Sequence, residues 1–141
     1  MENHTRRILL AEDDRFLRKA AAAMLRRQGF TVLTAEDGEE ALRVARAETP
    51  DLILLDLIMP KMQGFEVLKA LKSDPQTSSI PVVILSNLGQ ESDSKAAREM
   101  GALDYWVKAN LALEELVKRV EQTLTVSTSG ESAAAERQLA R

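Results

Sequence analysis

Cysteine is absent from this sequence, and histidine occurs once, at His4 in a polar N-terminal segment. The absence of cysteine excludes disulfides, thiolate catalysis and zinc–thiolate sites. A single histidine near the terminus also excludes a histidine-based triad and a metal site with several histidine ligands. Any chemistry must therefore come from other side chains.

Long apolar runs and an excess of positive charge are also missing. No run approaches the ~20 apolar residues of a membrane-spanning helix, and residues 1–7 lack the apolar core of a signal peptide. We therefore expect a soluble, non-exported protein of the cytoplasm with no membrane partner. The 19 Lys and Arg against 22 Asp and Glu give a net charge of −3, which argues against a nucleic-acid partner.

Apolar segments alternate with helical patterns along the chain. The apolar segments predict strands at residues 7–11, 30–35, 52–55, 80–85 and 103–107. Apolar residues at helical spacing predict helices at about 15–28, 37–47, 65–71, 91–100 and after Asn110, which is the expected cap of the last helix. Five such repeats predict an α/β fold, a five-stranded parallel sheet with helices on both faces and right-handed crossovers.

The chain is long enough for one domain, and its ends differ in composition from the middle. We expect residues 1–6 to be disordered and residues 7–124 to form the folded domain. Residues 125–141 are rich in Ser, Thr, Gly, Ala and Glu and have little to bury. They are therefore expected to form a flexible tail with no output domain.

The first helix carries several charged residues. Phe16, Ala20, Ala23 and Met24 share one of its faces, whereas Arg18 lies on another. Asp14 stands just before the helix, where a carboxylate favours the first turn through the helix macrodipole.

Every predicted strand except the second ends in a polar side chain suited to chemistry. Glu12 and Asp13 follow the first strand, Asp56 the third, Ser86 the fourth and Lys108 the fifth. The carboxyl ends of parallel strands lie along one edge of a sheet, so these side chains should gather there. If the strand order is 2-1-3-4-5, the winding reverses between strands one and three, and ligands bind at such a switch point.

Three neighbouring carboxylates repel one another unless a proton or a cation neutralises them. Oxygen ligands without histidine or cysteine suit a hard cation, and a few carboxylates plus waters suit Mg²⁺ better than Ca²⁺. Lys108 and the hydroxyl of Ser86 would then face an anion held by the metal, and a phosphoryl group fits this role. Asp56 is the best nucleophile, because it leaves the central strand between its partners.

The order and spacing of these residues resemble the receiver domain of two-component response regulators. The resemblance implies a flavodoxin-like α/β fold, a doubly wound five-stranded parallel sheet of strand order 2-1-3-4-5. The resemblance runs from about Arg7 to Leu124 and is carried by the acidic pair after the first strand and by a set of separated positions further on. These are Asp56, Met59, Pro60, Gly64, Ser86, Tyr105 and Lys108. It implies that Asp56 accepts a phosphoryl group from the phosphohistidine of a histidine kinase or phosphotransfer protein.

The resemblance also assigns the other roles. Asp13 would bind Mg²⁺ directly, Glu12 would help through water, and the backbone carbonyl of Ile58 would complete the protein ligands. Lys108 would pair with the phosphoryl group. Ser86 would donate a hydrogen bond to it, and Tyr105 would swing inward when the protein switches.

A receiver is a signalling phospho-acceptor rather than an enzyme, because its chemistry is limited to its own phosphorylation and dephosphorylation. The resemblance implies that it acts through the surface of the helix at 91–100, the strand at 103–107 and the last helix, where a downstream protein binds. On this surface Trp106 is expected to be exposed beside Tyr105 as an anchor, and the alternative is that Trp106 is half-buried and only packs. We expect a monomer or a weak dimer linked to phosphorylation.

Two positions depart from the family pattern, and two other functions compete. Asn87 stands where the family has a small residue, and Ala109 stands where it has proline. We expect the Lys108–Ala109 peptide bond to be trans, because a cis bond before a residue other than proline costs about 3–4 kcal/mol. The alternatives are a phosphorylation-independent binding module and a haloacid-dehalogenase-like phosphohydrolase. The latter needs a second acid at the position of Ile58.

Overall fold

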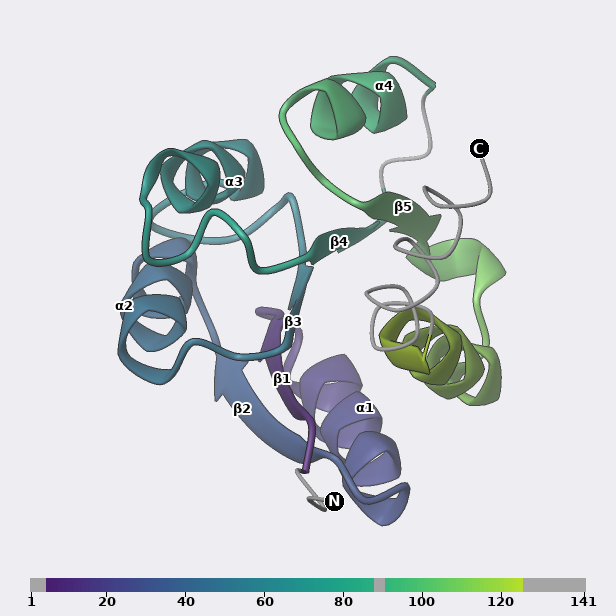
Figure 1. Cartoon of the computed structure of the whole chain (residues 1–141). Coiled ribbons are helices and arrows are strands. Elements are labelled where there is room, and N and C mark those ends of the chain that lie inside the picture. Colours follow the sequence, from purple (N-terminus) through teal and green to yellow (C-terminus); the bar gives the residue numbers. More distant parts are fainter. Residues whose placement is uncertain (1–4, 88–90, 126–141) are drawn as a thin grey trace, which may run out of the picture.

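A computed structural model describes residues 5–87 and 91–125 (Figure 1). Its elements are β1 (Arg7–Ala11), α1 (Arg15–Arg27), β2 (Thr31–Ala35), α2 (Gly38–Glu48), β3 (Leu52–Leu55), α3 (Gly64–Ser73), β4 (Val82–Ser86), α4 (Glu91–Glu99), β5 (Asp104–Val107) and a 3-10 turn (Lys108–Asn110). Residues 113–125 form the last helix. The terminal segments predicted at 1–6 and 125–141 lie almost wholly outside the described residues, so the domain bounds stay a prediction.

The five strands form one parallel sheet in the order β2-β1-β3-β4-β5, which confirms the predicted fold class. Figure 1 shows α2, α3 and α4 on one face of the sheet, and α1 with the last helix on the other. Alternate residues of each strand serve the two layers. Leu9 and Ile53, for example, pack toward α2 and α3, whereas Leu10 and Leu54 pack toward α1. Because both faces are covered, all four residues of β3 are fully buried.

The buried face of α1 is not the face that Phe16, Ala20, Ala23 and Met24 share. Phe16 is 87% exposed, whereas Ala21, Ala22 and Leu25 are buried together with Arg18. Alanines occur on both faces of this helix, so apolar spacing alone favours neither face. Arg18 decides the difference, because its guanidinium finds hydrogen-bond partners that make its burial possible.

The ends of several elements follow from local chemistry. Asp14 is the N-cap of α1, and its carboxylate accepts a hydrogen bond from the backbone N–H of Leu17 at 3.1 Å. Asn110 does not cap the last helix as predicted, because it closes the 3-10 turn and the helix begins at residue 113. The Lys108–Ala109 bond is trans, as predicted.

Asp37 caps α2. Its Oδ1 accepts a hydrogen bond from the backbone N–H of Glu40 at 2.9 Å, and Lys61 Nζ lies 3.6 Å from its Oδ2. The N–H of Glu40 is the main reason why the pKa of Asp37 is lowered from 3.8. The carboxylate of Glu40 accepts from the N–H of Glu36 rather than from Asp37, so half of a capping box is present.

Asp37→Ala is expected to destabilise the fold at neutral pH and to do so less as the pH falls. A carboxyl group with a lowered folded pKa stabilises the protein above its unfolded pKa, and that stabilisation is lost as the pH falls through the folded value. Urea unfolding at pH 7 and at about pH 3 measures the change. Asp37→Asn keeps the acceptor oxygen and serves as control. An equal loss for Asp37→Ala at both pH values would contradict the role of the charge.

Candidate functional site

Three carboxylates meet at the carboxyl edge of the sheet. Glu12 and Asp13 follow β1, Asp56 follows β3, and one oxygen of each lies within 4.8 Å of the others. The backbone holds the two strand ends in place, because the N–H of Glu12 donates to Ala35 O at 3.0 Å and that of Asp56 to Ala11 O at 3.1 Å. Glu12 and Asp56 are buried, and Asp13 is exposed. The structure therefore brings together the acids that the sequence singled out.

Lys108 reaches both buried acids from the end of β5. Its Nζ lies 2.7 Å from Asp56 Oδ2 and 2.6 Å from Glu12 Oε1. Burial lowers the pKa of Lys108, but the two carboxylates outweigh it and the pKa is raised. The pKa of Glu12 is raised, mainly by burial. The hydrogen bond from Lys108 lowers this pKa, and the negative charge of Asp56 raises it by a smaller amount. A single ammonium thus offsets only part of the negative charge of the three acids.

The cluster suits a hard divalent cation. Oε2 of Glu12 accepts from the N–H of Asp14 at 3.0 Å, and the buried Oε1 has Lys108 Nζ as its partner at 2.6 Å, so each oxygen keeps a lone pair for a cation. A buried carboxylate oxygen without a full set of partners, beside exposed Asp13, provides the oxygen donors that Mg²⁺ prefers. Glu12, Asp13 and Asp56 are the side chains that would hold the ion.

The loop after β3 packs tightly against the site. The N–H of Ile58 donates to Asp56 Oδ1 at 3.1 Å, and the side chain of Ile58 is 56% exposed. The N–H of Gly64 donates to Leu57 O at 2.9 Å. A Cβ at Gly64 would lie 2.4 Å from Leu57 Cα and 2.5 Å from Asp56 O, so this position requires glycine. That the carbonyl of Ile58 binds a metal stays a prediction.

Ser86 and Tyr105 lie side by side next to the acids. Ser86 ends β4 and is fully buried, and Tyr105 in β5 is 8% exposed. Burial raises the pKa of Tyr105, while its hydrogen bond with Ser86 acts in the opposite direction. Tyr105 is buried in this structure, and its inward swing on switching stays a prediction.

The prediction of an exposed Trp106 is wrong. Trp106 is 3% exposed and packs in the layer of α1 and the last helix. Its indole N–H donates to Asp104 Oδ2 at 3.0 Å, and the guanidinium of Arg119 lies 5.7 Å from its ring centroid. Successive side chains of a strand point to opposite faces, and here helices cover both faces, so Tyr105 and Trp106 are both buried.

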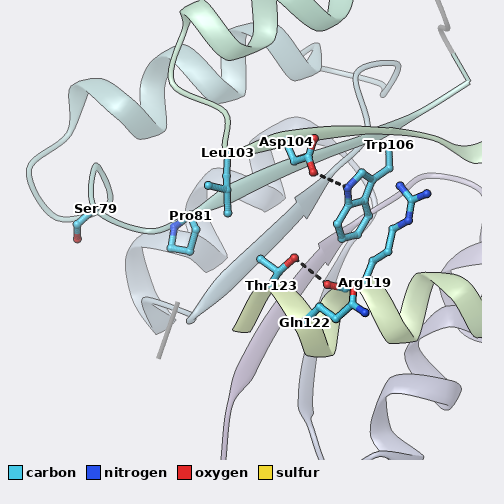
Figure 2. A pocket seen from close by; sticks show the side chains of 8 residues that line it. All are labelled: Ser79, Pro81, Leu103, Asp104, Trp106, Arg119, Gln122 and Thr123. Atoms are coloured by element: carbon cyan, nitrogen blue, oxygen red, sulfur yellow. Dashed lines mark hydrogen bonds between the residues drawn. The ribbon is translucent and has the colours of Figure 1, made fainter. Parts of the chain in front are cut away.

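A groove of about 610 Å³ lies beside Trp106 (Figure 2). It is lined by Ser79, Pro81, Leu103, Asp104, Trp106, Arg119, Gln122 and Thr123. Pro81 and Leu103 stand just before β4 and β5, so the groove lies at the amino ends of these strands. The acids stand at the carboxyl ends, and the groove is therefore separate from the acidic cluster.

Sequence reasoning missed Arg18. Its Nη1 donates to Glu12 O at 2.9 Å and to Asp13 O at 3.3 Å, so it binds the backbone of two of the acids. The helical spacing of Arg18, Ala21, Ala22 and Leu25 was the available signal, because it aligns the arginine with small and apolar residues.

The family model described as the response regulator receiver domain matches residues 8–121. Protein PilH of Pseudomonas aeruginosa is 37% identical over 118 residues, which are 84% of this chain and 97% of PilH. A gliding motility regulatory protein of Myxococcus xanthus is 39% identical over 116 residues, 82% of this chain but 15% of that protein. The chain likewise spans only 45% to 57% of several transcriptional regulators that it matches.

Solved structures show the same likeness. The chemotaxis response regulator CheY4 of Vibrio cholerae has a TM-score of 0.78 and 29% identity, covering 84% of this chain and 98% of that one. CheY in a CheX–CheY–BeF3–Mg complex from Borrelia burgdorferi has a TM-score of 0.77 and 29% identity, covering 84% and 89%. Among the helices that the structure describes, none has the length and apolar character to cross a membrane.

Proposed function

We propose, for a chain that belongs to the response regulator receiver domain family, that Asp56 accepts a phosphoryl group in a Mg²⁺-dependent reaction and that this step controls the binding of a partner protein. The observation that carries the proposal is the buried Asp56 carboxylate, which lies 2.7 Å from Lys108 Nζ and within 4.8 Å of the other two acids. The chain is thus a signalling protein and not an enzyme with an external substrate.

The transfer places each side chain in one role. A carboxylate oxygen of Asp56 attacks the phosphorus of a phosphohistidine, the phosphorus–oxygen bond forms, and the phosphorus–nitrogen bond breaks with its electron pair going to the imidazole. Bound Mg²⁺ supplies positive charge to the phosphoryl oxygens. Lys108 gives up its contact with Asp56 for a phosphoryl oxygen, and the Ser86 hydroxyl donates a hydrogen bond to another.

The donor is a histidine kinase or a phosphotransfer protein, and the output surface is formed by α4, β5 and the last helix. This surface exposes Lys95, Arg98 and Lys118, and Arg98 pairs with Asp104 at 2.8 Å. Asp104 also accepts from the N–H of Tyr105, so α4 is tied to the strand that carries the switch residue. The Borrelia burgdorferi CheX–CheY complex supports a protein target, although its partner is that protein's own.

Intact-mass analysis tests the metal dependence. The full chain is incubated with acetyl phosphate, a small phosphodonor, in Mg²⁺ and in excess chelator. We expect one phosphoryl adduct in Mg²⁺ and none in chelator, because the acids repel a dianionic donor unless a cation neutralises them. An adduct that forms equally fast in chelator, or no adduct in Mg²⁺, would refute the proposal.

A further inference from the structure

Arg18 binds three consecutive backbone carbonyls between β1 and α1. Its Nη1 donates to Glu12 O at 2.9 Å and to Asp13 O at 3.3 Å. Its own N–H donates to Asp14 O at 2.9 Å. The side chain therefore holds the carbonyls of the two acids, whereas the bond to Asp14 O is the ordinary backbone bond of the first helical turn.

The burial of Arg18 needs a physical reason. A buried guanidinium is costly unless it is paired or hydrogen-bonded. Its nearest carboxylate within the described residues is that of Glu36, at 3.9 Å and with 69% of its side chain exposed, and such a pair contributes little. The carbonyls of Glu12 and Asp13 supply the stronger contacts. Arg18 thus holds the loop between β1 and α1. The core on this face of the helix is filled by Ala21, Ala22 and Leu25 instead.

We infer that Arg18 is a positioning residue for the cation site, which sets the orientation of Glu12 and Asp13 through their backbone. The side chains of these acids leave the chain in directions that the backbone dihedrals determine, and bound carbonyls keep the two peptides from rotating. Asp13 depends on this most, because within the described residues the bond from Arg18 is the one hydrogen bond made to it. This inference rests on the proposed Mg²⁺ site.

Isothermal titration calorimetry with Mg²⁺ alone tests the inference on the full chain. Loss of an outer partner of a metal ligand typically weakens metal affinity 10–100-fold, so Arg18→Met should raise the Kd for Mg²⁺ by about tenfold or more. The Kd of Arg18→Lys should lie between those of the wild type and Arg18→Met, because an ammonium can donate to a carbonyl but lacks the planar fork of the guanidinium. Phosphorylation of Arg18→Met by acetyl phosphate should be slow at limiting Mg²⁺ and should recover at saturating Mg²⁺.

Arg26→Met is the matched control. Arg26 lies on the same helix and donates from Nη2 to Val32 O at 2.9 Å, far from the acids. Its loss should lower the Tm without changing the Kd for Mg²⁺. An Arg18→Met Kd equal to that of the wild type would overturn the inference, and so would an equal loss of affinity in Arg26→Met. Absence of Mg²⁺ binding in the wild type would instead refute the proposed function. If Arg18→Met does not fold, Arg18→Lys provides the comparison.

Discussion

Asp56→Asn is expected to abolish the uptake of a phosphoryl group from acetyl phosphate in Mg²⁺. Asparagine keeps the shape of the side chain and can still accept from the N–H of Ile58, but a neutral amide is not a nucleophile that forms an acyl phosphate. No other carboxylate in the described residues is at once buried, next to Lys108 and at the end of the central strand. Intact-mass analysis followed by peptide mapping measures the result.

Asp14→Asn is the control for this loss. Asp14 belongs to the same acidic run as Glu12 and Asp13, but it acts as the N-cap of α1, and asparagine is an equally good N-cap. Asp14→Asn should therefore take up the phosphoryl group like the wild type. A full adduct on Asp56→Asn would show that another residue is the acceptor.

Gly64→Ala is expected to cost roughly 3 kcal/mol of unfolding free energy and to slow phosphorylation, since overpacking against atoms that cannot move is strongly destabilising. The added Cβ would meet the backbone of Leu57 and Asp56 at 2.4 and 2.5 Å, and a real Cβ never approaches backbone so closely. The loop would have to move, and with it the residue that carries the reaction. Urea unfolding and the rate of adduct formation measure the two effects.

Gly29→Ala separates this clash from the ordinary cost of replacing glycine. Gly29 follows α1 with φ of +98°, and nothing lies within 4 Å of the added Cβ. Its replacement should cost only about 1 kcal/mol, the strain of a side chain in the left-handed region, and should leave phosphorylation unchanged. Equal losses for the two variants would mean that the contact of Gly64 with Asp56 is unimportant.

The parallel sheet and its acidic edge were predictable because both depend on patterns that parallel sheets impose, whereas the strand order came from the family resemblance. A strand covered on both faces must be apolar throughout, as Leu52–Leu55 is, and the polar residue that follows such a strand must emerge at a common edge. Asp56 and Lys108 are 52 positions apart in the sequence, yet the strand ends alone were enough to predict that they lie at the same edge of the sheet.

Other features depend on partners that a linear pattern does not show. The buried face of α1 could not be deduced from apolar spacing, because that pattern counts a charged residue as exposed. Arg18 is buried nevertheless, since its guanidinium binds carbonyls of the preceding loop. Trp106 was misplaced for a related reason. Whether an aromatic residue of β5 is covered depends on how the last helix packs, and Arg119 from that helix lies over its ring.

The arrangement of β5 also gives this chain an internal optical reporter. Trp106 is the single tryptophan of the sequence, and one peptide bond separates it from Tyr105, which contacts Ser86 in the opposite layer. Its indole shares the Asp104 carboxylate with the N–H of Tyr105. A movement of the Tyr105 backbone would therefore reach an acceptor to which the fluorophore is bound, and we expect the emission of the unlabelled protein to change with it.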